Sequence, residues 1–428
     1  MSQIQAVRGT KDILAPDIDL WRIVENISSN LLDLANYKEI RIPIFENSNL
    51  YTKSLGQVTD VVQKEMYNFT DRGKRELTLR PEGTAGVARA FIENKLYAHN
   101  LPQRVWYCGP MFRYERPQSG RQRQFHQLGL ECIGSSDPRV DVEIIVLALD
   151  ILQSLHITNL ELEINSLGNH QVRKIYREVL YNYFSQYKEE LDSEAKIRLE
   201  TNPLRLLDSK DPKLTNLLKE APSILNYLDQ TSSENFQLVC NYLDSISINY
   251  VVNPKLVRGL DYYNNTTFEI KSKTLGAQDT ICGGGRYDTL IESLGGPPIP
   301  AVGWAMGMER LLLSIPDSTF SLSKSLDCYL ITIGEEAQTY SLKLVYQLRK
   351  LNLKIDFSLT KSNLSKQIKK ASQLQALTCL IIGEEELKNQ TILCKWLESR
   401  EQEVINMSEI SIIADKIKVY KENVSLNI

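Results

Sequence analysis

The stretch GPMFRYERPQSGRQRQFHQLGLE, residues 109–131, predicts a long β-hairpin and decides how the surrounding chain folds. It consists of two arms of alternating residues, joined by a loop of proline, glycine, serine and glutamine. Because side chains alternate between the two faces of a strand, Arg113 and Glu115 share one face of the first arm. Gln127 and Glu131 share one face of the second arm, with a glycine between them. If the two sets coincide, the hairpin has one charged face.

The charged face has two interpretations that alternation alone leaves open: a solvated sheet surface with a basic tip, or a ligand-binding surface. Four arginines crowd this hairpin: Arg113, Arg116, Arg121 and Arg123. They would repel one another unless a polyanion joined them, and guanidinium groups bind phosphate oxygens in pairs. A triphosphate or a nucleic-acid end would fit. The opposite face, with Phe112, Leu128 and Leu130, is expected to pack on a core.

Two glycine-containing clusters accompany the hairpin. In LRPEGTAG, residues 79–86, Glu82 precedes a helix expected from about Thr84 to Lys95. Such an acid commonly complements a helix N-terminus, but it could also bind a substrate ammonium group. The second cluster is GGGRYD followed by AVGWAMGMERL, where Arg310 is expected near the start of a helix beside Glu309. Its glycines suit either close packing or close approach of a ligand, and neither a dinucleotide fingerprint nor a P-loop is present.

The segment KLVRGLDYY, residues 255–263, precedes the strand-forming TTFEI. Charged residues, a glycine and paired tyrosines at the mouth of a strand are unusual, and a solvated turn is the simplest explanation.

Composition describes an ordinary soluble globular protein of two or three domains. The 428 residues are 42% hydrophobic and 24% charged, with a net charge of -3, so any nucleic-acid contact must come from local basic patches. The seven cysteines and four histidines lack metal-ligand spacing, which predicts reduced thiols and no structural metal. No Ser-His-Asp order is evident. The N-terminus has no signal core and no apolar run could span a bilayer, so we expect a cytoplasmic protein, although an organellar protein lacking its transit peptide would look the same.

The chain changes character at three places. A helix over residues 18–36 precedes a strand pattern that Pro43 interrupts, which favours a sheet edge or a subunit contact. Residues 170–250 lose glycine and become rich in charged residues, leucine and tyrosine, which predicts a helical insertion. A Ser-rich linker at 316–326 separates the last part, where strand and helix patterns alternate. That alternation predicts a small, mostly parallel α/β domain.

These motifs, in this order, resemble the three signature motifs of class II aminoacyl-tRNA synthetases. The strand with Pro43 is similar to motif 1, FRYE with its return arm to motif 2, and the Gly-rich strand ending in GMERL to motif 3. KLVRGLDYY and GGGRYD resemble the two signature peptides of histidyl-tRNA synthetases. AVRGTKD, QVTDVVQKEMY, TLRPEGTAG and QFHQLGLE extend the resemblance over nearly the whole chain.

The resemblance implies ATP-dependent activation of L-histidine to histidyl-adenylate, release of pyrophosphate, and transfer to the 3' end of tRNA(His). Magnesium would accompany ATP as part of the substrate. The implied architecture is an antiparallel six-stranded catalytic sheet within residues 1–325, with the helical insertion at about 170–250. A C-terminal α/β anticodon-binding domain would occupy residues 326–428, and the chain would form a homodimer.

The resemblance also assigns the phosphate-binding residues. Arg113 would hold the α-phosphate and the substrate carboxylate, and Arg258 is the family-specific cation expected near the α-phosphate. These two arginines are the expected catalytic residues. Arg121 and Arg310 would bind the outer phosphates, with the adenine between Phe125 and Arg310.

The implied histidine-binding residues come from three separate segments: Glu82, Gly83, Thr84, Gln127, Glu131, Tyr262 and Tyr263. Glu82, Thr84 and Gln127 would meet the α-amino group. Glu131 and Tyr263 would face the imidazole, whose one N–H and one acceptor nitrogen a carboxylate and a hydroxyl can satisfy together.

Two alternatives stand beside this reading. One is the regulatory paralogue of histidine biosynthesis, which does not charge tRNA, usually lacks the C-terminal domain and degrades the signature residues. The other is a non-enzymatic tRNA-sensing module, which predicts eroded ATP-binding positions. Arg113, Glu131, Arg258 and Arg310 are all present, and about a hundred residues follow the linker. The anticodon contacts stay open, as does Asp261, which we expect to hold Arg258 or a backbone turn.

Overall fold

The computed structural model describes residues 3–56, 59–209, 211–273, 279–316, 319–320, 326–360 and 362–425. The chain divides into two compact units, Met1–Phe320 and Ser321–Ile428. Most of the predicted linker at 316–326, and the start of QVTDVVQKEMY at residues 57 and 58, lie outside the described residues. Within the described residues no helix is both long enough and apolar enough to span a bilayer.

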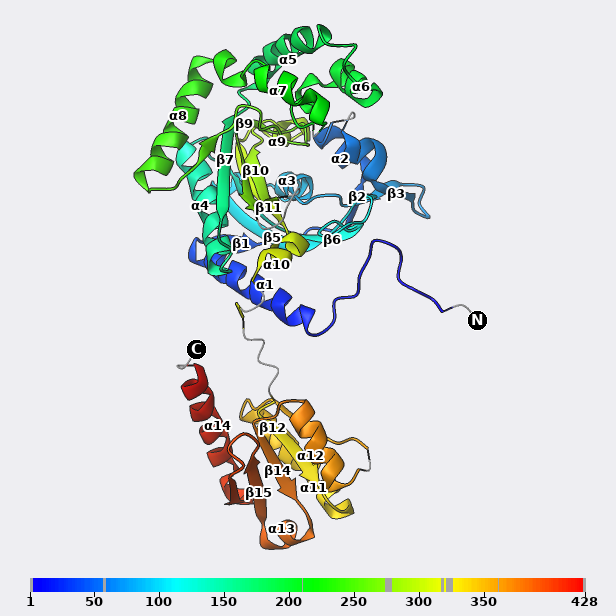
Figure 1. Ribbon diagram of the computed structural model, residues 1–428, viewed down its shortest axis with the longest axis vertical. Coiled ribbons are helices and arrows are strands. Elements are labelled where there is room, and N and C mark those ends of the chain that lie inside the picture. The colour runs from blue at the N-terminus through cyan, green and yellow to red at the C-terminus, as the bar shows by residue number, and fades with distance from the viewer. Residues whose placement is uncertain are drawn as a thin grey trace. The chain divides into compact units, whose positions relative to one another are not determined.

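A large sheet forms the centre of the first unit (Figure 1). Its strand order is β1-β5-β6-β11-β10-β9-β7-β8 in the described part of the chain. The strands are β1 (Lys38–Glu39), β5 (Gln103–Phe112), β6 (Gln124–Ile133), β7 (Leu160–Ser166), β8 (Val251–Val252), β9 (Asn264–Ser272), β10 (Thr280–Arg286) and β11 (Ala301–Gly307). The six strands from β5 to β7 are antiparallel to their neighbours, which confirms the predicted class of sheet. The two-residue strands β1 and β8 add parallel edges.

The segment around Pro43 does not form one strand. Its first part is β1 at the edge of the large sheet, and its second part is β2 (Phe45–Asn47) in a separate sheet of order β2-β4-β3. The partner strands are β3 (Tyr67–Thr70) and β4 (Glu76–Leu79). The proline lies between the two strands, because it cannot donate to a sheet ladder.

Helices cover both faces of the large sheet. The apolar face of the hairpin, with Leu128 and Leu130, packs into a core shared by α1 (Asp17–Leu34), α4 (Pro138–Ser154), α8 (Gln230–Ser245) and α10 (Met308–Ser314). The charged face lies on the side of a second core, to which α2 (Ser48–Ser54), α3 (Thr84–Glu93) and α9 (Leu290–Ser293) contribute. The alternation within the hairpin therefore separates a packed face from the face that carries Arg113 and Gln127.

The helical region at 170–250 has two parts. The helices α5 (His170–Ser185), α6 (Ser193–Thr201) and α7 (Thr215–Glu220), with the short 3-10 helix η3 (Pro203–Leu206), gather at one end of the sheet (Figure 1). Their apolar residues join the same core as α2 and α3. The helix α8 instead packs on α4. Only the first part lies on the side of the sheet that carries Arg113 and Gln127.

The second unit is a five-stranded sheet of order β13-β12-β14-β15-β16 within the described residues. Its elements are β12 (Cys328–Thr332), α11 (Glu335–Lys350), β13 (Ile355–Phe357), α12 (Leu364–Gln373), β14 (Thr378–Ile382), α13 (Glu384–Asn389), β15 (Thr391–Trp396), β16 (Gln402–Asn406) and α14 (Ile410–Ser425). The predicted parallel arrangement holds for the first three strands, which helices connect. The pair β15 and β16 is an antiparallel hairpin that the sequence did not indicate.

A buried ion pair ties the sheet to its helix layer. Arg286, at the end of β10, donates from Nε and Nη2 to the carboxylate of Asp141 in α4, at 2.9 and 2.6 Å. Its Nη1 donates to the carbonyl of Ser135, and its Nη2 also donates to the carbonyl of Asp137. The side chains are only 6% and 1% exposed. The arginine of GGGRYD therefore serves to join β10 to α4, and its guanidinium group is fully engaged in contacts within the protein.

We expect Arg286→Ala to lower the free energy of unfolding by about 3–5 kcal/mol, because it leaves the Asp141 carboxylate buried without its partner. Urea denaturation of the full chain measures this loss. Arg139→Ala is the matched control, since Arg139 pairs with Asp137 on the surface at 74% exposure and should cost about 1 kcal/mol or less. Equal losses in the two variants would contradict the assignment.

Candidate active site

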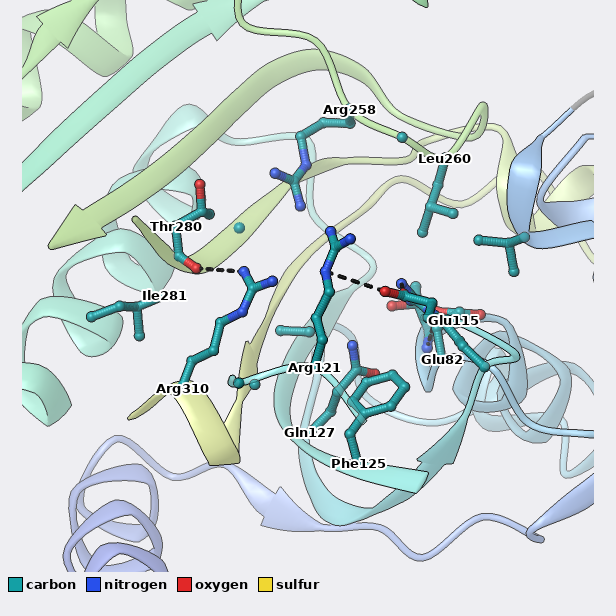
Figure 2. Close-up of a pocket in the computed structure, with 18 of the residues that line it drawn as sticks. Glu82, Glu115, Arg121, Phe125, Gln127, Arg258, Leu260, Thr280, Ile281 and Arg310 are labelled. Carbon is teal, nitrogen blue, oxygen red and sulfur yellow. Dashed lines mark hydrogen bonds and ion pairs between the residues drawn. The ribbon is translucent and has the colours of Figure 1, made fainter. Parts of the chain in front are cut away.

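A cavity of ≈ 300 Å³ opens over the centre of the large sheet. Six parts of the chain line it: the segment at Val61, the hairpin β5–β6, the start of α3, the segment that leads into β9, the strands β10 and β11, and the start of α10. Figure 2 shows side chains from these parts converging on one space. Segments far apart in the sequence therefore build a single site.

The sheet beneath this cavity is almost bare backbone. Gln127 of β6 pairs with Gly307, and two residues further along the strand Gly129 pairs with Ala305. Ala305 in turn pairs with Gly283 of β10. Because Gly283, Ala305 and Gly307 line the cavity and carry little or no side chain, this part of the sheet leaves room for a ligand to lie against it, whereas the ring of Tyr107 fills the space at Gly129.

Gly283 shows how tightly that room is used. A Cβ built on it would overlap the guanidinium group of Arg258. Gly303 lies on β11, two residues from Ala305, and a Cβ built on it would overlap the carboxylate of Glu131. Glycine at these two positions makes space for a cation and a carboxylate, so the Gly-rich strand does more than pack.

Arginines dominate one end of the cavity. Arg113, Arg121, Arg258 and Arg310 all line it. In Figure 2 the guanidinium groups of Arg121, Arg258 and Arg310 point toward one another. Arg121 pairs with Glu115 at 3.2 Å, and Arg310 donates to the carbonyl of Thr280 at 3.0 Å. Burial, and then the charge of Arg121, lowers the pKa of Arg310. The lining of this end of the cavity is therefore rich in positive charge.

Arg113 is oriented by three side-chain contacts, one of which is an ion pair with Glu115 at 3.8 Å. Its Nε donates to the carbonyl of Pro81 at 2.9 Å, and its guanidinium lies over the ring of Phe125 at 5.3 Å from the centroid. The adenine was predicted between Phe125 and Arg310. That stacking stays a prediction, and in this structure one contact of the Phe125 ring is with Arg113.

Arg258 is fixed from the opposite side by Glu269 of β9, with which its Nη1 forms an ion pair. Burial alone would lower the pKa of this guanidinium, but the charge of Glu269 together with Tyr263 and Tyr262 more than offsets it, so the pKa is raised. The Arg258 guanidinium also lies 5.5 Å from the centroid of the Tyr263 ring. Arg258 is thus a fully charged group held between Glu269, Gly283 and Tyr263.

The other end of the cavity carries carboxyl, amide and hydroxyl groups. Glu82 accepts hydrogen bonds from the backbone nitrogens of Thr84 and Ala85 at 2.7 and 2.9 Å, and from the hydroxyl of Tyr262 at 3.5 Å. Burial raises its pKa, and those two backbone N–H groups oppose the shift. Glu82 thus binds the first N–H groups of α3, as one interpretation predicted, and also lines the cavity; its contact with a substrate ammonium group stays a prediction.

Glu131 lies beneath the cavity and does not line it. Its two carboxylate oxygens accept from the hydroxyls of Thr84 at 2.7 Å and Tyr287 at 2.6 Å. Burial raises the pKa of Glu131 to about 8, against these two hydrogen bonds. Gly83 also lies off the cavity, and a Cβ there would overlap the ring of Tyr107.

The structure thus brings ten of the twelve predicted site residues together on the cavity wall: Glu82, Thr84, Arg113, Arg121, Phe125, Gln127, Arg258, Tyr262, Tyr263 and Arg310. The other two, Gly83 and Glu131, stand directly behind it. No group of His, Cys, Asp or Glu side chains arranged to hold a metal ion occurs in the described part of the chain.

Sequence reasoning missed three supporting residues: Glu115, Glu269 and Tyr287. Alternation had placed Glu115 on the face of Arg113, but it gave no hint of the pairing with Arg121. Glu269 is the one acid in an otherwise uncharged TTFEI, which could have marked it as the partner of a cation. Tyr287 lies within GGGRYD but reaches Glu131 only through the fold.

The expectation that Asp261 holds Arg258 is wrong. Its carboxylate accepts from Asn202 at 3.2 Å and lies 4.0 Å from Arg205, both in or beside η3 of the helical insertion. Arg258 is held by Glu269 instead. His126, for which a packing role was expected, packs edge-on against Trp21 and contacts Glu309 at 3.1 Å.

Comparison with known families agrees with this geometry. A sequence model described as "Histidyl-tRNA synthetase" matches residues 9–311, and one described as "Anticodon binding domain" matches residues 327–416. The first spans every part of the chain that lines the cavity. The second spans most of the C-terminal unit.

Similar proteins cover almost the whole chain. A histidine–tRNA ligase of Crocosphaera subtropica is 52% identical over 96% of this chain and 95% of its own. A chloroplastic histidine–tRNA ligase of Pyropia yezoensis is 51% identical over 99% of both chains. The crystal structure of apo S. aureus histidyl-tRNA synthetase superposes with a TM-score of 0.81 at 37% identity, covering 96% of this chain and 99% of that one. The chain therefore belongs to the histidyl-tRNA synthetase family.

Proposed function

We propose that this protein activates L-histidine with ATP to histidyl-adenylate and transfers the histidyl group to the 3' end of tRNA(His). The observation that carries the proposal is the division of one cavity into a cluster of four arginines and a pocket of carboxyl, amide and phenol groups. The first end suits a triphosphate and the second a small zwitterion with a polar side chain. Relatives with half of their residues identical carry the name histidine–tRNA ligase.

In the first step an oxygen of the histidine carboxylate attacks the α-phosphorus of ATP. The new P–O bond forms as the bond to the pyrophosphate group breaks, and negative charge develops on the oxygens around phosphorus. Arg113 and Arg258 are the groups we assign to that charge, because both are fixed by other contacts before the substrate arrives. Fixed charges stabilise the transition state without reorganisation during the reaction.

Arg121 and Arg310 are assigned to the β- and γ-phosphates. Their guanidinium groups approach each other and Arg258 in Figure 2. We expect Mg²⁺ to arrive with ATP as part of the substrate. Glu115 and Glu309 line the cavity, but Glu115 is paired with Arg121 and Glu309 with the backbone and ring of His126. Mg²⁺ bound to nucleotides usually keeps several waters and needs few protein carboxylates.

We assign the α-amino group of histidine to Glu82, Thr84 and Gln127. The Oε1 atom of Gln127 is buried and accepts no hydrogen bond within the described residues. A buried acceptor without a donor costs about 1–3 kcal/mol, and a substrate ammonium group would satisfy it. This atom supports the assignment.

The imidazole is assigned to Tyr263 and Glu131. Tyr263 lines the cavity, whereas Glu131 stands behind Thr84 and would meet the ring only by exchanging a hydrogen bond that it already makes. An amino acid whose side chain offers no partner to the Tyr263 hydroxyl would leave that buried group without this contact, at about 1–3 kcal/mol. Selectivity for histidine would follow from that penalty.

We propose residues 1–325 as the catalytic domain and residues 326–428 as the anticodon-binding domain. The division of the chain near residue 320 and the family matches to 9–311 and 327–416 support these bounds. We propose a cytoplasmic location, with a plastid as the alternative because one relative is chloroplastic. The non-charging paralogue is disfavoured, since the four diagnostic residues are in place and the anticodon-binding match is present.

We expect a homodimer, as the family implies. The small sheet after Pro43 exposes Ile44, Phe45 and Phe69 at 45, 54 and 41%, and the two phenylalanine rings pack edge-on. Such a patch suits a subunit interface. Sedimentation equilibrium should give twice the mass of one chain, and Phe45→Glu should shift the protein toward monomer. A wild-type protein that stays monomeric at high concentration would contradict the proposal.

The purified protein should exchange labelled pyrophosphate into ATP when histidine is present and with no other standard amino acid. The reason is that the reverse of adenylate formation needs both ends of the cavity to be filled correctly. Exchange supported by a different amino acid, or none at all, would overturn the proposed function.

Within the same assay, Arg258→Ala should lower the exchange rate by about 100- to 1000-fold, as expected for one electrostatic stabiliser of a transition state. Lys271→Ala is the control, because Lys271 lies on β9 like Glu269 and forms an ion pair with Glu163 of β7, but does not line the cavity. It should retain near wild-type exchange.

The buried Glu131 should make stability depend on pH. Its folded pKa of about 8 lies above the ordinary value of 4.5, so between these values the folded protein holds a proton that the unfolded chain has released. Stability should therefore fall as pH rises from about 5 to 8, by about 5 kcal/mol at most. Glu131→Gln should lack this share of the slope in urea denaturation. Parallel slopes for the two proteins would show that the carboxyl is ionised throughout.

A further inference from the structure

The segment 257–263 carries Arg258, Tyr262 and Tyr263 but belongs to no helix or strand. Its backbone polar groups therefore need partners from elsewhere. Its position decides where the assigned catalytic cation and two residues of the amino-acid pocket lie. What holds this segment is thus a question about the reaction as well as about the fold.

Two arginines of the helical insertion bind the backbone of this segment. Arg173 of α5 donates from one nitrogen to the carbonyls of Asp261 and Tyr263, at 3.0 and 2.7 Å. Arg205 of η3 donates to the carbonyl of Gly259 at 2.9 Å. Three carbonyls in five residues are held by side chains from a different module.

The Asp261 side chain completes the clamp. Its carboxylate accepts from Asn202 and lies 4.0 Å from Arg205. Burial raises the pKa of Asp261, and Arg205 and Arg173 oppose the shift. Burial lowers the pKa of Arg173, and the charge of Asp261 opposes that shift. The two desolvated charges stabilise each other in the charged state.

Contacts with the end of α2 hold the segment on its other side. Its Asp261 backbone nitrogen donates to the carbonyl of Leu55 at 3.4 Å. Gly56 has a φ of +86°, and a Cβ on it would overlap the Asp261 carboxylate. The segment therefore lies between the end of α2 and the insertion, and a shift of α5 or η3 would move it.

We propose that Arg173 and Arg205 are positioning residues through which the helical insertion sets the geometry of segment 257–263, and so the affinity of the cavity for the amino acid. This inference rests on the proposed function for the identity of that amino acid. By thermodynamic linkage the coupling runs both ways, so histidine binding in the cavity stabilises the insertion around α5.

Kinetics of pyrophosphate exchange test the proposal. Arg173→Ala should raise the KM for histidine and lower kcat, so that kcat/KM for histidine falls by about 10- to 100-fold, as expected for a displacement of about 1 Å at the site. The KM for ATP should change by less than about 3-fold. Arg173→Lys should fall between, because a lysine keeps the charge but lacks the planar donor fork.

Arg177→Ala is the matched control. Arg177 lies one turn further along α5, is exposed, and donates to the carbonyl of Thr201 within the insertion. It should behave as wild type. Kinetics of Arg173→Ala that equal those of Arg177→Ala, with an active wild type, would overturn the inference and leave the proposed function intact. A wild type without histidine-dependent exchange would overturn the function instead.

Hydrogen exchange of the wild-type protein gives a test that needs no variant. Saturating histidine should slow amide exchange in α5 and η3 as well as in residues 257–263. Protection of the segment alone, with α5 and η3 unchanged, would overturn the coupling even if Arg173→Ala failed to fold.

Discussion

The site depends on one constraint: the strands at the centre of the large sheet must carry almost no side chains of their own on one face. Gly129, Gly283, Gly303 and Ala305 meet in adjacent register positions of β6, β11 and β10, so three neighbouring strands present nearly bare backbone on one face. Glycine in a strand costs stability, and six antiparallel strands with a large apolar core on the opposite face supply the compensation. The space gained is occupied by Arg258 above Gly283 and by Glu131 against Gly303. A methyl group at either position would displace the residue on which the assigned chemistry depends.

A second constraint follows from placing four arginines around one cavity. Their mutual repulsion lowers the stability of the folded protein as long as no phosphate is bound. Glu115 pairs with Arg121, and Glu269 pairs with Arg258, so each carboxylate reduces the repulsion and fixes the orientation of its guanidinium group. Arg310, which lies near Arg121 and Arg113, has its pKa lowered mainly by burial and then by the charge of Arg121. The cavity is thus organised for a polyanion at a cost in stability, which is the usual relation between an active site and its fold.

The sequence predicted those features that depend on local periodicity. Alternation placed Leu128 and Leu130 of β6 on the packed face, because the period of a strand is two wherever it pairs. Arg113 and Glu115 were expected in the first arm but follow the end of β5 at Phe112, and both line the cavity from the connecting segment. Alternation could not predict what depends on register between distant strands, such as Gly303 opposite Glu131, or on contacts between modules, such as Asp261 with Asn202. The helical character of residues 170–250 was visible, but the packing of α8 on α4 and not with α5 was not, since an apolar stripe does not identify the surface on which it packs. The hairpin of β15 and β16 escaped because its alternation is short and mixed with charged residues.

The burial of Glu82 and Glu131 connects recognition to the fold. Thr84 donates through its hydroxyl to Glu131 and through its backbone nitrogen to Glu82, so one residue at the start of α3 joins the two carboxyl groups. Tyr287 binds the second oxygen of Glu131, and Tyr262 lies within reach of Glu82. A ligand that changes the charge on either group must therefore act on the whole network, because a buried hydrogen bond broken at one member leaves another member unpaired. An amino acid that fits this pocket has to satisfy several groups at once, and that requirement can distinguish one side chain from others of similar size.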